Sequence, residues 1–338
     1  MSFVAALLLF LFPAAAGISS DVLLVVDRNV VRIFDAKTGE QRSEARIGEG
    51  VHEIEVLADR TTAVLSNYGT PQQPGRTVTL LDVDRGTLLG TIDLGQGTMP
   101  RGLTSLPNGR FLVAAEGKKE LLVVDSVERR VITRIPLGRD GYHMVVATPD
   151  GSRAFVASSR AGLVTAVNLS PVRILRDIVT GPGPVGMDVT PDGKSVWVTG
   201  PASDSVWLID AVDPGIFPRI PVPTFPNRVR ITPDGRYALV SCTRSGEVAV
   251  FDAATRREIK RISVVRSAVL AEGAHVARGG IPHLPGPTHL VVEPNGRYVW
   301  VSFQGSNAVC RFDLETVTLS RTLLVSSEPG ALAGRFPR

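Results

Sequence analysis

The sequence is poor in cysteine and lacks the short motifs of covalent and metal-dependent catalysis. Only two cysteines, Cys242 and Cys310, occur among 338 residues, and neither a Cys-x-x-Cys pair nor a Cys-x-x-Cys-His haem attachment site is present. A Gly-x-Ser-x-Gly elbow, a Gly-x-x-x-x-Gly-Lys phosphate loop and a His-Glu-x-x-His motif are also missing. These absences argue against covalent catalysis and a self-contained c-type haem. Export would permit a disulfide, but the two cysteines lie at different points of different repeats, so we expect two buried thiols.

The sequence also lacks a large excess of one charge sign and has no long apolar run. The 37 basic and 33 acidic residues leave a net charge of +4 that is spread without runs, so we expect no nucleic-acid partner. The apolar run at residues 3–16 is too short to span a bilayer and ends in three alanines before Gly17. Residues 1–17 are therefore predicted to be a signal peptide. The mature chain should be periplasmic or extracellular, without a transmembrane segment.

A repeated strand pattern takes the place of any helical pattern. Pro-Asp-Gly or Pro-Asn-Gly turns begin at residues 107, 149, 191, 233 and 294, and the first four are 42 residues apart. Each turn is followed by a short strand rich in β-branched and aromatic residues, such as Ser195–Thr199. The next apolar run ends in Asp or Asn, placed to accept hydrogen bonds from the turn that follows. Two further strands complete the unit.

Four strands repeated about seven times predict an all-β fold, a seven-bladed β-propeller of four-stranded antiparallel blades. We expect one propeller domain over residues 21–338. From the inside of the ring outwards, we name the strands of a blade inner, second, third and outer, and the inner strand leads into the Pro-Asp-Gly turn. The first repeat lacks an inner strand, which Gly330–Phe336 could supply. The N- and C-terminal segments should therefore pair and close the ring, which removes two open sheet edges.

The repeats resemble those of a known family. Pro149–Ser158 with Val164–Asn168, and Pro191–Thr199 with Ser205–Asp210, are similar to the YVTN-type repeats of exported bacterial and archaeal seven-bladed propellers. The resemblance extends from residue 21 to about residue 325. Relatives by this repeat include surface-layer proteins, the haem-d1 domain of nitrite reductases and, more distantly, propeller lactonases. Because unrelated activities share the fold, the resemblance implies the architecture and leaves the function open.

One connection is about nineteen residues longer than its counterparts. Pro233 and Pro294 lie 61 residues apart, and the extra residues fall at about 265–287, between an outer strand and the next inner strand. This connection emerges on the face where the inner strands begin. The resemblance implies that ligands bind on this face, so we expect the insertion to form a partial lid over a ligand site.

All five histidines of the chain map to the same face. His275 and His283 lie in the insertion, and the other three lie where inner strands begin. Six residues before the turn, the inner strands carry polar side chains in five repeats: His52, Arg101, His143, Asn227 and Thr288. Two residues deeper the side chains are apolar, as at Leu103 and Val145. The sequence predicts a polar rim over an apolar floor, which is typical of a small-ligand site.

Candidate ligand-binding residues follow from this rim, and they are His52, Glu53, Arg101, His143, Asn227, His289, His275 and His283. Three converging imidazoles, those of His52, His143 and His289, would suit Zn, Cu, Fe or a haem iron, although no closely spaced ligand pair fixes a geometry. Arg101 could bind a carboxylate or phosphate, or pair with Glu53 of the adjacent repeat or with Glu116 of its own.

Candidate catalytic residues are His143 and Glu116, the latter being the best-placed carboxylate for a general base. For each of them a solvated or locally bonded side chain is the simpler interpretation. Asp188 and Arg230 occupy the same register in successive repeats and are predicted to form an inter-blade ion pair.

Three functions remain open at this stage. The sequence favours an exported binding or scaffold protein with a small molecule or a protein at one face. The resemblance leaves two alternatives, a lactonase-like hydrolase or lyase that uses a histidine or Glu116, with or without a divalent metal, and haem-d1-type binding. The sequence does not identify a cofactor.

Overall fold

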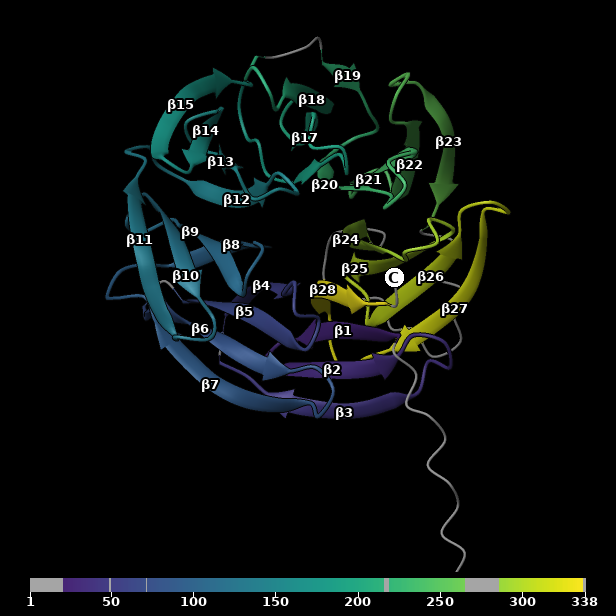
Figure 1. The fold of residues 1–338 in the computed structure, drawn as a ribbon. Helices are drawn as coiled ribbons and strands as arrows, with labels where there is room; N and C mark the ends of the chain where they lie inside the picture. The colour runs from purple at the N-terminus through teal and green to yellow at the C-terminus, as the bar shows by residue number, and fades with distance from the viewer. Residues whose placement is uncertain (1–20, 49, 71, 216–218, 265–285, 337–338) are drawn as a thin grey trace, which may run out of the picture.

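The computed structural model describes residues 21–336, apart from residues 49, 71, 216–218 and 265–285. Its strands form seven four-stranded antiparallel sheets that are arranged in a ring, and the described residues contain no helix (Figure 1). The predicted seven-bladed β-propeller is confirmed. The predicted signal peptide and the insertion residues 265–285, with His275 and His283, lie outside the described residues.

The strands of every blade are ordered from the channel outwards, with the inner strand first. The closing blade is β28 (Pro329–Arg335), β1 (Val22–Asp27), β2 (Val30–Asp35) and β3 (Gln41–Arg46). Three blades follow in chain order: β4 (Val51–Val56), β5 (Thr62–Gly69), β6 (Pro74–Asp82), β7 (Thr87–Asp93); β8 (Pro100–Ser105), β9 (Arg110–Ala115), β10 (Glu120–Asp125), β11 (Arg130–Pro136); β12 (Tyr142–Ala147), β13 (Arg153–Ser158), β14 (Leu163–Leu169), β15 (Val172–Val179). The last three are β16 (Met187–Val189), β17 (Ser195–Gly200), β18 (Ser205–Asp210), β19 (Ile220–Pro221); β20 (Pro226–Ile231), β21 (Tyr237–Cys242), β22 (Glu247–Asp252), β23 (Glu258–Ser263); β24 (Gly286–Val292), β25 (Tyr298–Gln304), β26 (Ala308–Asp313), β27 (Thr318–Leu324).

The two ends of the described chain close the ring, as predicted. Strand β28 pairs antiparallel with β1, with Val22 opposite Arg335 and Leu24 opposite Ala333. Figure 1 shows the yellow β28 beside the purple β1. Leu332 and Phe336 pack with Leu23 and with Trp300 of the neighbouring blade. Closure therefore buries apolar side chains in addition to satisfying backbone groups.

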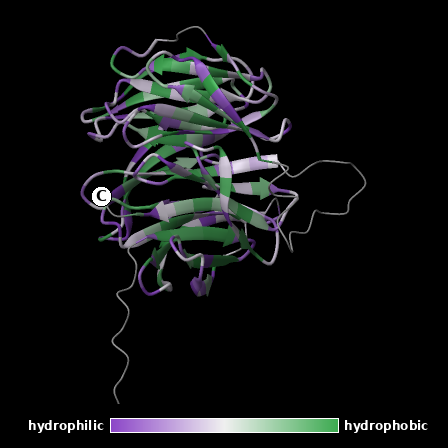
Figure 2. Ribbon diagram, turned by 90° about the vertical axis from the view of Figure 1, so that its right-hand side faces the viewer, coloured by the Kyte–Doolittle hydropathy of each residue, from purple (hydrophilic) through white to green (hydrophobic). Residues whose placement is uncertain are grey.

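The apolar core is distributed between neighbouring blades. Second strands are almost fully buried, as in β13 and β17, whereas outer strands are mainly exposed. The apolar layers are visible as green strands in Figure 2. Each apolar cluster joins two blades, as where Val78 and Leu80 meet Phe111 and Val113. This arrangement keeps the inner strands fixed around the axis of the ring.

The predicted roles of the turn aspartates and of the two cysteines are confirmed. The Oδ1 atom of Asp35 accepts the backbone N–H groups of Lys37 and Thr38, at 2.8 and 2.9 Å. The aspartates at the ends of the other third strands act in the same way at positions 82, 125, 210 and 313. Cys242 and Cys310 are free and buried. Burial raises the pKa of the Cys242 thiol to about 12, so it is inert at neutral pH.

Candidate functional site

A β-bulge near the start of the inner strands positions the polar residues. In β4 the pairing with β5 shifts between Val51 and Ile54, so His52 and Glu53 fall in the bulge. Equivalent shifts occur in β8, β12, β20 and β24. In β4, β20 and β24 the N–H of the second bulge residue donates to a serine hydroxyl of the next strand, as from Glu53 to Ser66 Oγ at 3.0 Å. Because a bulge redirects consecutive side chains, adjacent residues of one strand both reach the site.

A cavity of about 280 Å³ lies at the end of the channel where the inner strands begin. We call it the mouth cavity. Its polar lining comes from four inner strands and comprises His52, His143, Asn227, Arg228, Thr288 and His289, and Gln304, Glu328 and Pro329 complete the wall. Four of the predicted ligand residues thus meet at one cavity. Glu53 and Arg101 stand directly behind this wall, in contact with Arg228 and His52 respectively.

A buried ion pair joins Glu53 and Arg228 across the ring. The Arg228 Nη2 atom donates to Glu53 Oε1, and their side chains are only 4% and 6% exposed. The same nitrogen lies 3.0 Å from His289 Nε2. Since a guanidinium only donates, His289 accepts at Nε2 and carries its proton on Nδ1. The Nε and Nη1 atoms of Arg228 and the Nδ1 atom of His289 are buried without a hydrogen-bond partner among the described residues.

A second group of polar side chains supports His52. Arg101 Nε donates to His52 Nε2 at 3.1 Å, and Arg101 Nη1 donates to Glu116 Oε2 at 2.7 Å. The Tyr68 hydroxyl donates to the same Glu116 oxygen at 3.0 Å. Of the two glutamates expected to pair with Arg101, Glu116 is therefore the one that forms the ion pair. The Glu116 carboxylate fixes Arg101 and is already engaged by two donors.

The histidines of the mouth are neutral at physiological pH. Burial lowers the pKa of His289 to about 4, and the nearby Arg228 charge acts in the same direction. Burial also lowers the pKa of His52 and, more strongly, that of His143. The Arg228 charge holds the pKa of Glu53 well below its usual range despite burial, which opposes this shift. The fixed charges of this group are therefore those of arginine and glutamate.

The three histidines do not present the geometry of a metal site. No group of three or more His, Cys, Asp or Glu side chains within the described part of the chain could hold a metal ion. The rings of His52 and His143 lie edge to face with centroids 5.4 Å apart. The Nε2 lone pairs of His52 and His289 already accept from guanidinium groups, and those two positive charges disfavour a cation.

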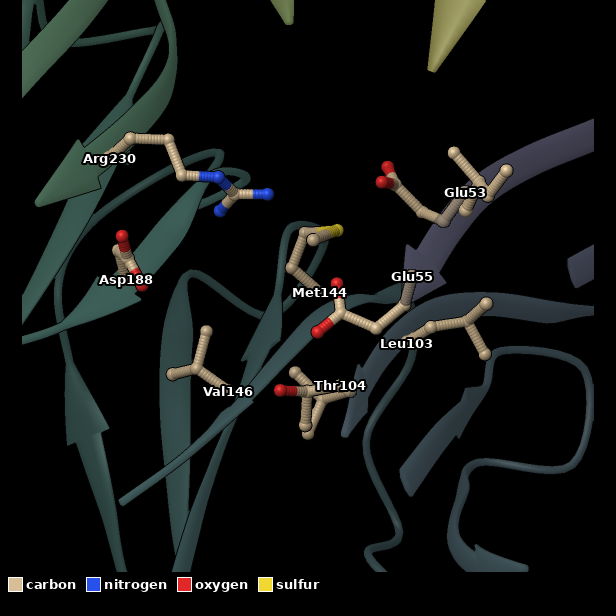
Figure 3. Close-up of a pocket in the computed structure, with 10 residues that line it drawn as sticks. Glu53, Glu55, Leu103, Thr104, Met144, Val146, Asp188 and Arg230 are labelled. Atoms are coloured by element: carbon tan, nitrogen blue, oxygen red, sulfur yellow. The ribbon is translucent and has the colours of Figure 1, made fainter. Parts of the chain in front are cut away.

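A second cavity of about 200 Å³, which we call the inner chamber, lies deeper in the channel. Figure 3 shows Arg230 and Asp188 facing Glu53 and Glu55 across it. Leu103 and Val145 line the chamber as predicted, but the four charged residues mean that the predicted apolar floor is wrong in part. The bulge is the physical reason, because it shifts the channel-facing positions by one residue.

The charged groups of the inner chamber do not form the predicted ion pair. Asp188 Oδ2 accepts the backbone N–H of Ile231 in the next blade at 2.8 Å. Among the ion pairs of the described residues none within 4.0 Å joins Asp188 to Arg230, whose charge acts on Asp188 from a greater distance. Burial raises the pKa of Asp188 and raises that of Glu55 to about 7, with Arg230 opposing both shifts. Glu55 therefore titrates near neutral pH.

The sequence analysis did not identify Arg228 or Glu55 as site residues, and it did not predict that the inner chamber is polar. Arg228 follows Asn227 directly, and strict strand alternation points its side chain away from the rim. A signal was available in the serine at the fifth position of three second strands, because Ser66, Ser241 and Ser302 each accept the N–H of a bulge residue.

Comparisons with known proteins show the fold alone. No family model and no curated protein sequence matches the chain. A functionally unknown protein from Desulfotomaculum acetoxidans DSM 771 superposes with a TM-score of 0.76 at 14% identity, over 94% of this chain and 100% of that one. A protein of Bacteroides fragilis NCTC 9343 described as a candidate 6-phosphogluconolactonase gives 0.70 at 18% identity, over 96% and 99%.

Hydrazine synthase of Kuenenia stuttgartiensis gives a TM-score of 0.67 at 19% identity, over 83% of this chain and 88% of that one. At these identities a shared activity does not follow from a shared architecture. The chain is thus a seven-bladed β-propeller, and the solved structures that share its fold carry different descriptions.

Proposed function

We propose that this protein is an exported β-propeller of the YVTN-repeat group that binds a small molecule in the mouth cavity. One observation carries the proposal: residues from five blades converge on a cavity where polar atoms of Arg228, His143 and His289 are buried without partners. Buried polar groups in folded proteins are nearly always paired, so unpaired ones beside a cavity favour a ligand or ordered water there.

Binding is better supported than acid–base catalysis at the mouth. A general base works best when its pKa lies near the working pH. The pKa values of His143 and Glu53 are well below their usual ranges, and the carboxylate of Glu116 is held by Arg101 and Tyr68. Haem-d1-type binding through His52 or His289 would require the guanidinium contacts at Nε2 to break.

The binding proposal is tested by a thermal-shift screen of small polar compounds. Compounds that bind at the mouth should raise the Tm of the wild type and have no effect on a variant carrying His143→Ala and Asn227→Ala. A control variant with Arg130→Ala, on the exposed strand β11, should respond like the wild type. Shifts that are equal in all three proteins would place the ligand elsewhere and contradict the proposal.

Export is the second part of the proposal. Expression with the natural N-terminus should yield periplasmic or secreted protein that begins near Gly17, as judged by fractionation and N-terminal sequencing. Full-length protein retained in the cytoplasm would contradict it. The described residues contain no helical segment able to cross a membrane.

A further inference from the structure

Arg228 is charged, buried and incompletely paired. A guanidinium has five N–H donors, and here only Nη2 has partners, Glu53 and His289. Nε and Nη1 lack partners although the side chain is only 4% exposed. Leaving buried charged donors unsatisfied costs more free energy than leaving neutral donors unsatisfied. An acceptor from outside the described chain would remove this penalty.

The other unpaired atoms at the mouth also favour an acceptor ligand. His289 accepts from Arg228 at Nε2, so its unpaired Nδ1 is a donor. His143 contributes a further unpaired Nδ1. Glu53 is already bound by Arg228, and Glu328 lies exposed at the edge of the cavity. The mouth therefore offers donors that nothing in the described residues satisfies.

The chemistry and the size of the cavity narrow the ligand class. A charged guanidinium N–H donates a strong hydrogen bond to a carboxylate oxygen, and the free Nε and Nη1 atoms, which point to different sides of the Arg228 guanidinium, can each donate to one such oxygen. The volume of about 280 Å³ is at the lower end of small-molecule sites, which span roughly 300–1,000 Å³. A compact ligand with few heavy atoms fits this space.

We propose that the mouth cavity binds a small carboxylate through the unpaired N–H donors of Arg228, with His289 and His143 donating beside it. This inference rests on the proposed function, because it names the ligand class of the same site. Glu53 is then a positioning residue, since it holds Arg228 by Nη2 and leaves the Nε and Nη1 donors to the ligand.

Bound carboxylate should also change the protonation of the site. His289 faces Arg228 from β20 and Glu53 and His52 from β4. Burial and the Arg228 and His52 groups lower the pKa of His289 to about 4, and Glu53 opposes this shift, so His289 is neutral at physiological pH. An added negative charge favours the imidazolium. Carboxylate binding should therefore take up protons, and affinity should rise as pH falls from 7 towards 5. A neutral ligand would not produce this linkage.

The test is calorimetric titration of the mature chain with acetate and pyruvate, and with acetamide as the neutral isostere of acetate, at constant ionic strength. We expect saturable acetate binding at least tenfold tighter than acetamide binding, with proton uptake seen as a dependence of the heat on buffer ionisation. Acetamide binding as tight as acetate binding would overturn the carboxylate inference while leaving small-molecule binding at the mouth intact.

Variants locate the bound anion. Arg228→Met combined with Glu53→Gln removes both buried charges together and should abolish acetate binding. The matched control, Arg130→Met with Glu128→Gln, removes an exposed ion pair at the start of β11 and should leave binding unchanged. Asn227→Asp adds a carboxylate to the lining without touching the pair, and it should weaken acetate binding at least tenfold even where the double variant fails to fold. Unchanged binding in folded Asn227→Asp protein would overturn the inference.

Discussion

At the scale of single residues, two glutamates of one strand have opposite electrostatic environments. Glu53 contacts the Arg228 guanidinium, which keeps its carboxyl ionised, whereas Glu55 lies two residues deeper, where burial dominates and its pKa rises to about 7. The nearest backbone donor to Glu55 is the N–H of Ser105, at 3.5 Å. Direct contact with a counter-charge therefore decides which carboxylate remains charged at neutral pH.

Glu55→Gln should change how stability depends on pH. The folded pKa of about 7 exceeds the unfolded value near 4.3, so the protonated carboxyl favours the fold below about pH 4.3 and this contribution is lost as pH rises towards 7. In urea unfolding, the free energy of unfolding of the variant minus that of the wild type should increase by up to about 3 kcal/mol between pH 4 and pH 8.

The exposed carboxylate of Glu128 supplies the control for this measurement. Glu128→Gln should leave the pH dependence of unfolding unchanged. Parallel stability curves for wild type and Glu55→Gln would show that the Glu55 carboxylate is not buried in the chamber.

The sequence could predict the meeting of the histidines but not their protonation. His52, His143 and His289 occur near equivalent positions of the repeat, so the fold alone brings them to one end of the ring. Their neutral state depends on burial and on Arg101 and Arg228, whose side-chain directions follow from the bulge. Strict alternation of side chains gives no indication of such a shift.

At the scale of elements, the bulges connect neighbouring blades as well as positioning the site. The Thr199 hydroxyl accepts from the N–H of Gly186 at 2.9 Å and donates to Asn227 O of the next blade at 3.0 Å. Ser241 donates in the same way to Thr288 O, and Ser302 to Gly330 O. The residues that carry the ligand-binding side chains are therefore fixed by the blade that precedes them.

Gly186→Ala should disturb both stability and binding. A Cβ at this position would lie 2.3 Å from Asn227 O and 2.8 Å from Arg228 Cα, which are backbone atoms of the site strand. We expect a loss of roughly 1–3 kcal/mol in the free energy of unfolding, as for overpacked cores, together with weaker carboxylate binding. Denaturant unfolding and calorimetry measure the two effects.

Gly215→Ala is the matched control, because its added Cβ would meet its nearest atom, Asp213 O, at an ordinary 3.6 Å. This variant should bind normally and lose little stability. If both variants had the same stability and affinity, the backbone near Gly186 would accommodate the added Cβ without loss of free energy, which contradicts the prediction.

At the scale of the whole molecule, the repeat was sufficient to predict architecture and closure. The 42-residue spacing and the incomplete first repeat specify seven blades and the β28–β1 pairing, because every blade needs the same four strands. The cavities could not be predicted in the same way. The shape and polarity of each cavity depend on which side chain of each blade points towards the axis of the ring. That side chain differs from blade to blade, because different residues occupy the bulge in each blade.

Removal of residues 329–338 should open the ring. The shortened chain loses the buried side chains of Leu332 and Phe336 and exposes the inner edge of β1. Large-to-small substitutions of such residues each cost about 2–5 kcal/mol, so we expect a loss of at least about 5 kcal/mol and a tendency to aggregate. Calorimetry and size-exclusion chromatography would show both effects. A chain that ends at Phe336 is the control, and equal stability of the two would contradict closure by β28.

The position of β28 links occupancy of the site to the integrity of the ring. Pro329, the first residue of β28, and the preceding Glu328 form part of the wall of the mouth cavity. A nascent chain consequently has no complete site until its final strand docks. A ligand that binds only when β28 is paired with β1 stabilises the closed ring by its binding free energy. Bound ligand would therefore protect the C-terminal strand from fraying and from proteases.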